Sequence, residues 1–151
     1  MTIYKKKPRG FSRKEAEAVA CFVEDDKRCV LFLLRAKGKL IAPHKWASPA
    51  GRVEKRETKE QAMLRELREE TGLKPEENRL LYTRSVYIVF KSGIKFVFHV
   101  FRLRYNCRPE IVFNDENEAV VWLMPEQALA SLRLMEDEAE CVRSIFELNT
   151  K

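Results

Sequence analysis

The chain lacks the long apolar stretch that a membrane protein needs. Its longest apolar run, residues 29–34, is far shorter than the roughly 20 residues of a membrane-spanning helix. The amino terminus also lacks the apolar core of a signal peptide. We therefore expect a cytoplasmic protein with no membrane partner.

Paired cysteines and metal-type histidine clusters are missing as well. The four cysteines, at positions 21, 29, 107 and 141, show neither close pairing nor the spacing typical of a zinc site. The two histidines, His44 and His99, are isolated in the sequence. A chain of 151 residues does not need disulfides to fold, so we expect free thiols and no zinc centre.

Internal repeats and low-complexity linkers are also absent. A chain of 151 residues, of which 45% are hydrophobic, is long enough for one core and too short for two ordinary domains. Many of the basic residues crowd the amino terminus. The sequence predicts a basic segment over residues 1–14 and a single domain over residues 15–151.

The sequence does contain a helix whose two ends are both marked. Thr58 and Gln61 have the spacing of a capping box, in which the hydroxyl and the amide satisfy first-turn backbone groups. Gly72 suits the left-handed position just after a helix, and Pro75 cannot continue one. These signals predict a helix over residues 59–71.

Acidic residues gather on one face of this helix. At about 100° per residue, Glu66, Glu69 and Glu70 share a face beside an apolar stripe that includes Met63 and Leu67. Like charges at these spacings repel by only about 0.2–0.5 kcal/mol per pair, so a solvated acidic face is one interpretation. A divalent cation bound among the carboxylates is the other, because it would relieve the repulsion.

The spacing of residues across this helix and the preceding loop favours the second interpretation. The pattern consists of Gly51, Glu57, Arg65, Glu66, Leu67, Glu69, Glu70, Gly72 and Leu73. It matches the signature box of the Nudix hydrolases at every specified position, and the chain therefore resembles this family. A full match over residues 51–73 is a specific signal.

The resemblance implies chemical roles for four of these residues. In Nudix enzymes the loop and helix hold magnesium or manganese against the diphosphate of a nucleoside diphosphate derivative, and water attacks a phosphorus atom. By similarity, Glu69 and Glu70 would be the main metal ligands, and Glu66 would complete the metal shell or accept the proton of the attacking water. Gly51 would supply its backbone carbonyl.

Two further residues would support this set. By similarity, Arg65 and Glu57 would pair and orient the carboxylates. Hard cations prefer oxygen ligands, so several carboxylates on one face suit Mg²⁺ or Mn²⁺ better than zinc. We expect one of these ions as the cofactor.

The remaining elements fit one fold class. The residue patterns predict strands over residues 15–23, 28–35, 45–48, 80–90, 95–104 and 119–123, and further helices over residues 125–132 and 136–148. The first two strands are expected to pair with each other, and so are residues 80–90 and 95–104. This order indicates an α/β protein with a mixed sheet covered on both faces, which is the Nudix alpha/beta/alpha sandwich.

Candidate site residues also lie outside the box. Glu116 resembles the family glutamate that enters the site from a loop about six residues before a tryptophan, as a metal ligand or general base. Glu118 is the alternative, because loop registers slip easily. Arg35, Lys39 and Arg52 are candidates for binding the phosphates of a substrate, since the loops near the box should approach the same cleft.

Several hypotheses about function stay open. The favoured one is a metal-dependent pyrophosphohydrolase of a nucleoside triphosphate or another nucleoside diphosphate derivative, with a small-molecule nucleotide as partner. An ADP-sugar or dinucleoside polyphosphate pyrophosphatase is a variant of it. The complete set of acids argues against a noncatalytic nucleotide-sensing module, because binding alone would not require every one of them. An RNA 5′ pyrophosphohydrolase is suggested only by the net charge of +6 and the basic amino terminus, so nucleic acid is a less favoured partner.

Overall fold

One mixed sheet covered by helices on both faces forms the structure. The computed structural model describes residues 1–9, 11, 16–39 and 43–148. Its strands are β1 (Thr2–Tyr4), β2 (Ala16–Glu24), β3 (Val30–Arg35), β4 (Trp46–Ala47), β5 (Ala50–Arg52), β6 (Leu81–Val89), β7 (Lys95–Arg104) and β8 (Asn117–Leu123). Its helices are α1 (Lys59–Thr71), the short 3-10 turn η1 (Glu77–Arg79), α2 (Pro125–Ser131) and α3 (Glu136–Ile145).

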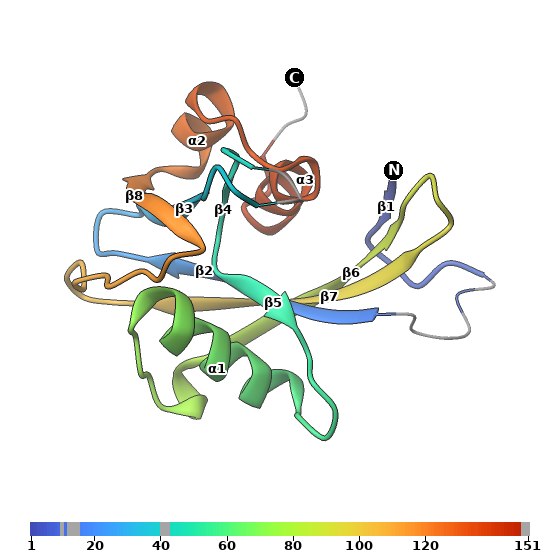
Figure 1. Ribbon diagram of the computed structural model, residues 1–151, viewed down its shortest axis with the longest axis horizontal. Helices are drawn as coiled ribbons and strands as arrows, with labels where there is room; N and C mark the ends of the chain where they lie inside the picture. Colours follow the sequence, from blue (N-terminus) through green and yellow to red (C-terminus); the bar gives the residue numbers. More distant parts are fainter. Residues whose placement is uncertain (10, 12–15, 40–42, 149–151) are drawn as a thin grey trace.

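The layers are arranged as the sequence predicts. Helix α1 lies on one face of the sheet, and α2 and α3 lie on the other (Figure 1). The strand order is β1-β6-β7-β2-β3-β4, with β5 added to β2 and β8 added to β3. Strands β2 and β7 are parallel and the other pairs are antiparallel, so the prediction of a mixed alpha/beta/alpha sandwich is confirmed.

The expected hairpin of β2 and β3 is paired only next to its turn. Glu24 opposite Val30 is the single aligned pair between these strands. Beyond it β2 pairs along its whole length with β7, from Ala16 opposite Phe96 to Glu24 opposite Arg104. Strand β3 instead pairs with β4 and β8. The two strands therefore diverge and open the space in which the loop of β4 and β5 lies.

Strand β2 is apolar on both sides because both of its faces are buried. Cys21 and Val23 are in the core that includes Leu67 of α1, whereas Phe22 is in the core that includes Val142 of α3. All five side chains are fully buried. A central strand with two covered faces reads as a continuous apolar run, which is how residues 18–23 appear in the sequence.

Helix α1 begins and ends where its capping residues predict. Thr58 Oγ1 accepts a hydrogen bond from the Gln61 backbone at 3.1 Å, and Gln61 Oε1 accepts one from the Thr58 backbone at 2.9 Å. Gly72 has a φ of 74°, and its N–H donates to the Arg68 carbonyl at 3.0 Å. The capping box and the glycine thus fix the position of the helix relative to the loop before it.

Two strands and a turn were not expected from the sequence. Strand β1 pairs with β6 through Ile3 opposite Ile88, so part of the basic amino-terminal segment belongs to the sheet. Strand β5 pairs with β2 through Gly51 opposite Val19.

All four cysteines are free, as their spacing predicts. None of the helices within the described ranges is both long enough and apolar enough to span a membrane.

The packing of α1 on the sheet gives a first testable prediction. Truncating fully buried Leu67 to alanine removes methyl groups from the core, and we expect Leu67→Ala to lower the free energy of unfolding by about 2–5 kcal/mol. The exposed neighbour Arg68 provides the control, since Arg68→Ala should change it by less than about 0.5 kcal/mol. Urea unfolding followed by circular dichroism measures both, and equal effects would contradict the packing described here.

Candidate active site

Three of the glutamates of α1, those of the box, differ in their surroundings. The Glu66 side chain is 13% exposed and lies against Gly51, where a Cβ atom would overlap its carboxyl group. Glu70 is 9% exposed, and its Oε2 accepts a hydrogen bond from the Ala50 backbone at 2.8 Å. The Glu69 side chain is half exposed. Loop and helix therefore meet at Glu66 and Glu70, and position 51 has no room for any side chain in this arrangement.

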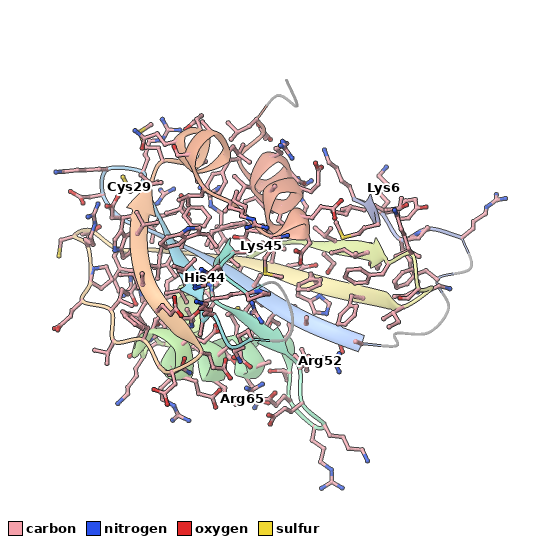
Figure 2. All side chains as sticks on the ribbon, turned by 45° about the horizontal axis from the view of Figure 1, so that its top comes forward. Lys6, Cys29, His44, Lys45, Arg52 and Arg65 are labelled. Carbon is pink, nitrogen blue, oxygen red and sulfur yellow. The ribbon has the colours of Figure 1, made fainter. Side chains whose placement is uncertain are left out.

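Arg65 binds the loop to the helix through four hydrogen bonds. Its Nε and Nη2 donate to the two carboxylate oxygens of Glu57 at 2.8 and 3.0 Å. Its Nη1 donates to Glu66 Oε1 at 2.6 Å, and its Nη2 also donates to the Arg52 carbonyl at 2.8 Å. Figure 2 labels Arg65 and Arg52 beside α1 and the loop that follows β5. The bidentate pair holds the pKa of Glu57 below its usual value, so this carboxylate stays ionised.

Burial raises the pKa of the two inner glutamates. The pKa of Glu66 is raised chiefly by loss of solvent, against the opposing hydrogen bond from Arg65. The pKa of Glu70 is raised to about 8, chiefly by burial and to a lesser extent by the charges of Glu66 and Glu116. The Ala50 N–H and the charge of Arg35 act in the opposite direction. Crowded, desolvated carboxylates of this kind are stabilised in their ionised form by a nearby cation.

The donor set fits a hard divalent cation. Glu66, Glu69, Glu70 and the Gly51 carbonyl offer only oxygen ligands, as Mg²⁺ and Mn²⁺ prefer. Within the described residues, no three acidic, histidine or cysteine side chains are grouped closely enough to form a ready-made metal cage. Glu66 accepts a hydrogen bond from Arg65, and Glu69 Oε2 lies 3.6 Å from Arg65 Nη1. Binding a cation would thus require these two carboxylates to turn away from the guanidinium.

The structure distinguishes between the two loop acids. Glu116 lies before β8, and its charge contributes to the raised pKa of both Glu66 and Glu70, after burial as the main cause. Glu118 instead accepts a hydrogen bond from the Lys37 backbone at 2.8 Å, and its other oxygen lies 3.1 Å from His44 Nε2. Electrostatic proximity therefore favours Glu116 as the loop acid of the site.

The three candidate phosphate-binding cations lie in different places. Lys39 Nζ is 3.2 Å from Glu116 Oε1, and the charge of Arg35 acts on Glu70, so both belong to the neighbourhood of the acidic cluster. The guanidinium of Arg52 lies 5.3 Å over the Phe96 ring. Residues 40–42, which follow Lys39, lie outside the described part of the chain.

A buried acid on α3 was missed by the sequence analysis. Glu138 Oε1 accepts hydrogen bonds from the backbone N–H and the hydroxyl of Ser48, at 2.9 and 2.7 Å. Burial raises the pKa of Glu138 to about 7, although the Ser48 donors oppose this shift. Glu138 thereby tethers the segment that leads into Gly51. No local pattern in the sequence connects positions so far apart.

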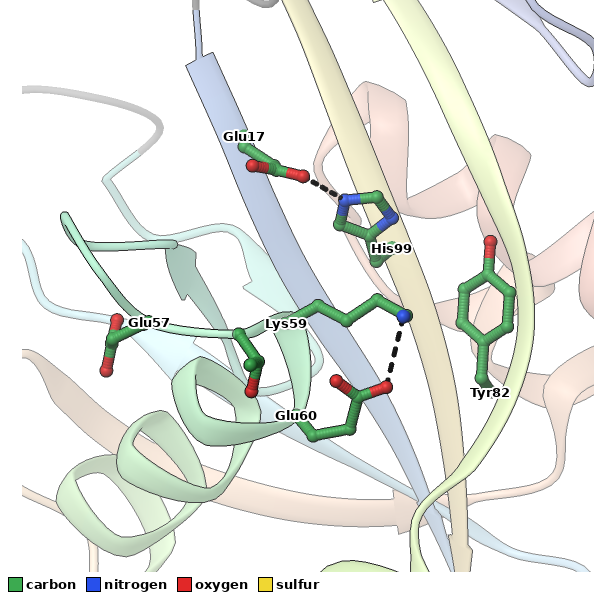
Figure 3. Close-up of a pocket in the computed structure, with 7 residues that line it drawn as sticks. Glu17, Glu57, Lys59, Glu60, Tyr82 and His99 are labelled. Carbon is green, nitrogen blue, oxygen red and sulfur yellow. Dashed lines mark hydrogen bonds and ion pairs between the residues drawn. The ribbon is translucent and has the colours of Figure 1, made fainter.

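A separate hollow of about 470 Å³ lies at the amino end of α1. It is lined by Glu17, Glu57, Thr58, Lys59, Glu60, Tyr82 and His99 (Figure 3). His99 is fixed there between Glu17 Oε1 at 2.7 Å and Ser85 Oγ at 2.8 Å. Among the lining residues, Glu57 is the one that belongs to the specified positions of the box, and Glu66, Glu69 and Glu70 do not line the hollow.

Comparison with known proteins identifies the family. The model of the NUDIX domain matches residues 14–145, which is most of the chain. The chain belongs to the Nudix family. The Nudix resemblance of residues 51–73 is thereby confirmed on independent grounds.

Individual Nudix relatives agree with this result. The MutT protein of Methanosarcina mazei has the same fold, with a TM-score of 0.77, 20% identity and coverage of 93% of this chain and 99% of that one. The ORF135 protein of Escherichia coli is 28% identical, with a TM-score of 0.73 and coverage of 95% and 96%. An RNA pyrophosphohydrolase of Psychromonas ingrahamii is 47% identical over 53 residues, or 35% of this chain and 29% of that protein. The chain spans less than half the length of the curated relatives it matches.

The buried carboxyl of Glu138 predicts a pH-dependent stability. Its pKa is about 7 in the folded protein, against an ordinary value of 4.5, so folding favours the protonated form. The stability that it provides is complete below pH 4.5 and is lost as the pH rises through 7. Glu138→Gln keeps an acceptor for Ser48 without the charge. We therefore expect the variant to match the parent protein at pH 4 and to exceed its unfolding free energy by about 2–3 kcal/mol at pH 8.5.

Urea unfolding at both pH values measures this difference. Glu140→Gln is the control, because it removes the same charge from the same helix at a half-exposed position. A surface ion pair such as that of Glu140 and Arg143 contributes at most about 1 kcal/mol, and this contribution should change little between the two pH values. Parallel pH profiles of parent and Glu138→Gln would show that Glu138 titrates as an exposed acid does.

Proposed function

We propose that the protein is a metal-dependent pyrophosphohydrolase that cleaves the diphosphate linkage of a nucleoside triphosphate or another nucleoside diphosphate derivative. The proposal rests on one observation: the loop at Gly51 and the helix α1 hold two largely desolvated carboxylates, Glu66 and Glu70, close to each other, and the charge of Glu116 reaches both. Family membership supports the same reaction class.

Different residues of the chain are suited to different roles in this reaction. Glu66, Glu69, Glu70 and the Gly51 carbonyl are suited to hold the cation. A bound Mg²⁺ or Mn²⁺ supplies a more acidic water molecule and neutralises charge on the phosphoryl oxygens. Glu116 is suited to accept the proton of the attacking water, because it is an exposed acid at the rim of the cluster.

Positioning is the task of the surrounding residues. Arg65 fixes Glu66 and the loop through Glu57 and the Arg52 carbonyl. Ser48, held by Glu138, fixes the approach to Gly51. Arg35 and Lys39 are suited to bind substrate phosphates beside the acids. A noncatalytic nucleotide sensor would not need this complete set of ionisable groups.

A substitution of Glu70 tests the proposal. Glu70→Gln keeps an oxygen for the Ala50 N–H but removes the charge, so we expect metal-dependent turnover to fall by on the order of 100-fold or more. The variant should unfold no more easily than the parent at pH 8, since a desolvated carboxyl is removed. The phosphorylated products are separated and quantified for a panel of nucleoside triphosphates, ADP-sugars and dinucleoside polyphosphates, with Mg²⁺ and with Mn²⁺. Nucleoside triphosphates should give a mononucleotide and pyrophosphate or a nucleoside diphosphate and phosphate, and the other two classes should give two phosphorylated fragments.

The same assay identifies the bond that breaks. Water labelled with heavy oxygen marks the phosphorus that is attacked, and chromatography separates the two products. Glu76→Gln is the matched control, because Glu76 is an exposed glutamate just before η1 and should leave turnover unchanged. Unchanged turnover in Glu70→Gln, or nucleotide binding by the parent without any release of product, would refute the hydrolase proposal.

Removal of a 5′ diphosphate from RNA is the second candidate function. The relatives in Psychromonas ingrahamii and Haemophilus influenzae that match parts of this chain are RNA pyrophosphohydrolases. The exposed residues Lys5, Lys6 and Lys7 follow β1 and are suited to phosphate contacts. This function predicts faster turnover of triphosphorylated oligonucleotides than of free nucleotides, with affinity that falls steeply as salt rises. Equal turnover of both, insensitive to replacement of the three lysines by glutamine, would exclude it.

A further inference from the structure

Asn117 carries a buried hydrogen-bond donor that the fold itself does not use. Asn117 is the first residue of β8 and is 8% exposed. Its Nδ2 atom is covered and forms no hydrogen bond, and among the described residues it is the only buried side-chain nitrogen or oxygen of this kind. A buried donor without an acceptor destabilises the folded state, so a role that retains it is expected.

The position of Asn117 relates it to the acidic cluster. It pairs with Arg35 at an irregularity between β3 and β8, and it directly follows Glu116. Figure 1 shows β3 and β8 as neighbouring strands. The charges of both Arg35 and Glu116 reach Glu70. Irregularities of this type are common beside active sites, where they redirect a side chain.

Nearby acceptors of the chain already have donors. The Glu116 carbonyl accepts the Ala36 N–H at 2.9 Å, and Asn114 Oδ1 accepts the Glu116 N–H at 3.1 Å. Glu70 Oε2 accepts the Ala50 N–H at 2.8 Å. These three acceptors and the adjacent Glu118 carboxylate, which accepts the Lys37 N–H, each bind a donor other than Asn117 Nδ2. An incoming ligand with oxygen acceptors would supply the acceptor that Asn117 Nδ2 lacks.

The chemistry of the surroundings indicates which ligand this is. The acids of α1 already have one donor beside them, the Arg65 guanidinium. Strands β3 and β8 carry two further donors, Arg35 and Asn117. A diphosphate has several oxygen acceptors and requires donors opposite the metal-binding acids. A neutral amide adds a directional hydrogen bond without a further charge in a site already crowded with charges.

We propose that Asn117 binds the substrate directly, its Nδ2 group donating a hydrogen bond to a phosphate oxygen of the diphosphate. This inference rests on the proposed function and assigns to the site a residue outside the box. A small movement of the loop before β8 is part of the proposal, because Nδ2 is covered in the free protein.

Asn117→Leu tests the inference, because leucine has a similar size and no donor. Binding of inorganic pyrophosphate and of the α,β-methylene analogues of the four ribonucleoside triphosphates is measured by calorimetry with Mg²⁺. For the probes that bind the parent, we expect Kd to rise at least about 10-fold, because one hydrogen bond to a charged ligand is lost. Without ligand, Tm should stay the same or rise by a few degrees, since the unused donor is gone.

Two more variants make the result decisive. Asn117→Ala tests the same donor without the bulk of leucine, and binding is compared at a temperature at which circular dichroism shows every variant folded. Asn78→Leu is the matched control, because Asn78 is an exposed amide in η1, and its Kd should equal that of the parent. Values of Kd within two-fold of the parent for both Asn117 variants would overturn the inference.

Failure of the inference differs from failure of the proposed function. If the parent protein hydrolyses nucleotides while both Asn117 variants bind as well as it does, only the role of Asn117 is wrong. If the parent neither binds these probes nor hydrolyses any member of the substrate panel, the proposed function fails and this inference fails with it.

Discussion

The ion pair between Arg65 and Glu57 is the contact on which the site depends. It joins the loop after β5 to the middle of α1, and the same guanidinium also holds Glu66 and the Arg52 carbonyl. Several carboxylates crowded at a protein surface repel one another, and an internal cation balances part of that repulsion. Glu70 accepts a hydrogen bond from the Ala50 backbone, and burial raises its pKa to about 8 although the charge of Arg35 opposes the shift. The two inner acids thus differ in the described contacts: Glu66 is bonded to a guanidinium and Glu70 to a backbone N–H.

Local features of the sequence were sufficient to predict α1 and the box. The capping box at Thr58 and the glycine at position 72 act over a few residues, and the structure has the helix at the predicted bounds. The helical repeat likewise places Glu66 and Glu70 at one buried edge, because their spacing in space follows directly from their spacing in the chain. The terminal helices follow from the same kind of periodicity, although α3 ends before the expected residue.

Long-range contacts account for what the sequence did not predict. Strand β5 has three residues and is a strand only because β2 lies beside it. The tether from Glu138 to Ser48 and the pairing of Asn117 with Arg35 join segments that no periodicity connects. The predicted pairing of the first two strands holds at a single pair for the same reason: apolar residues show that a strand is buried, but they do not specify its neighbour. The side-chain contacts that favour Glu116 over Glu118 as the loop acid are likewise not visible in the sequence.

The parallel pairing of β2 with β7 has a consequence for synthesis of the protein. Ala16 of β2 pairs with Phe96 of β7, so the apolar strand β2 leaves the ribosome long before β7, the strand that covers its edge. At about 5–20 residues per second, this delay amounts to several seconds at least. During that interval an unpaired apolar edge is exposed to other nascent chains. The order of the strands along the chain therefore leaves one edge of β2 without its parallel partner at a stage when β5 and α1 are already synthesised.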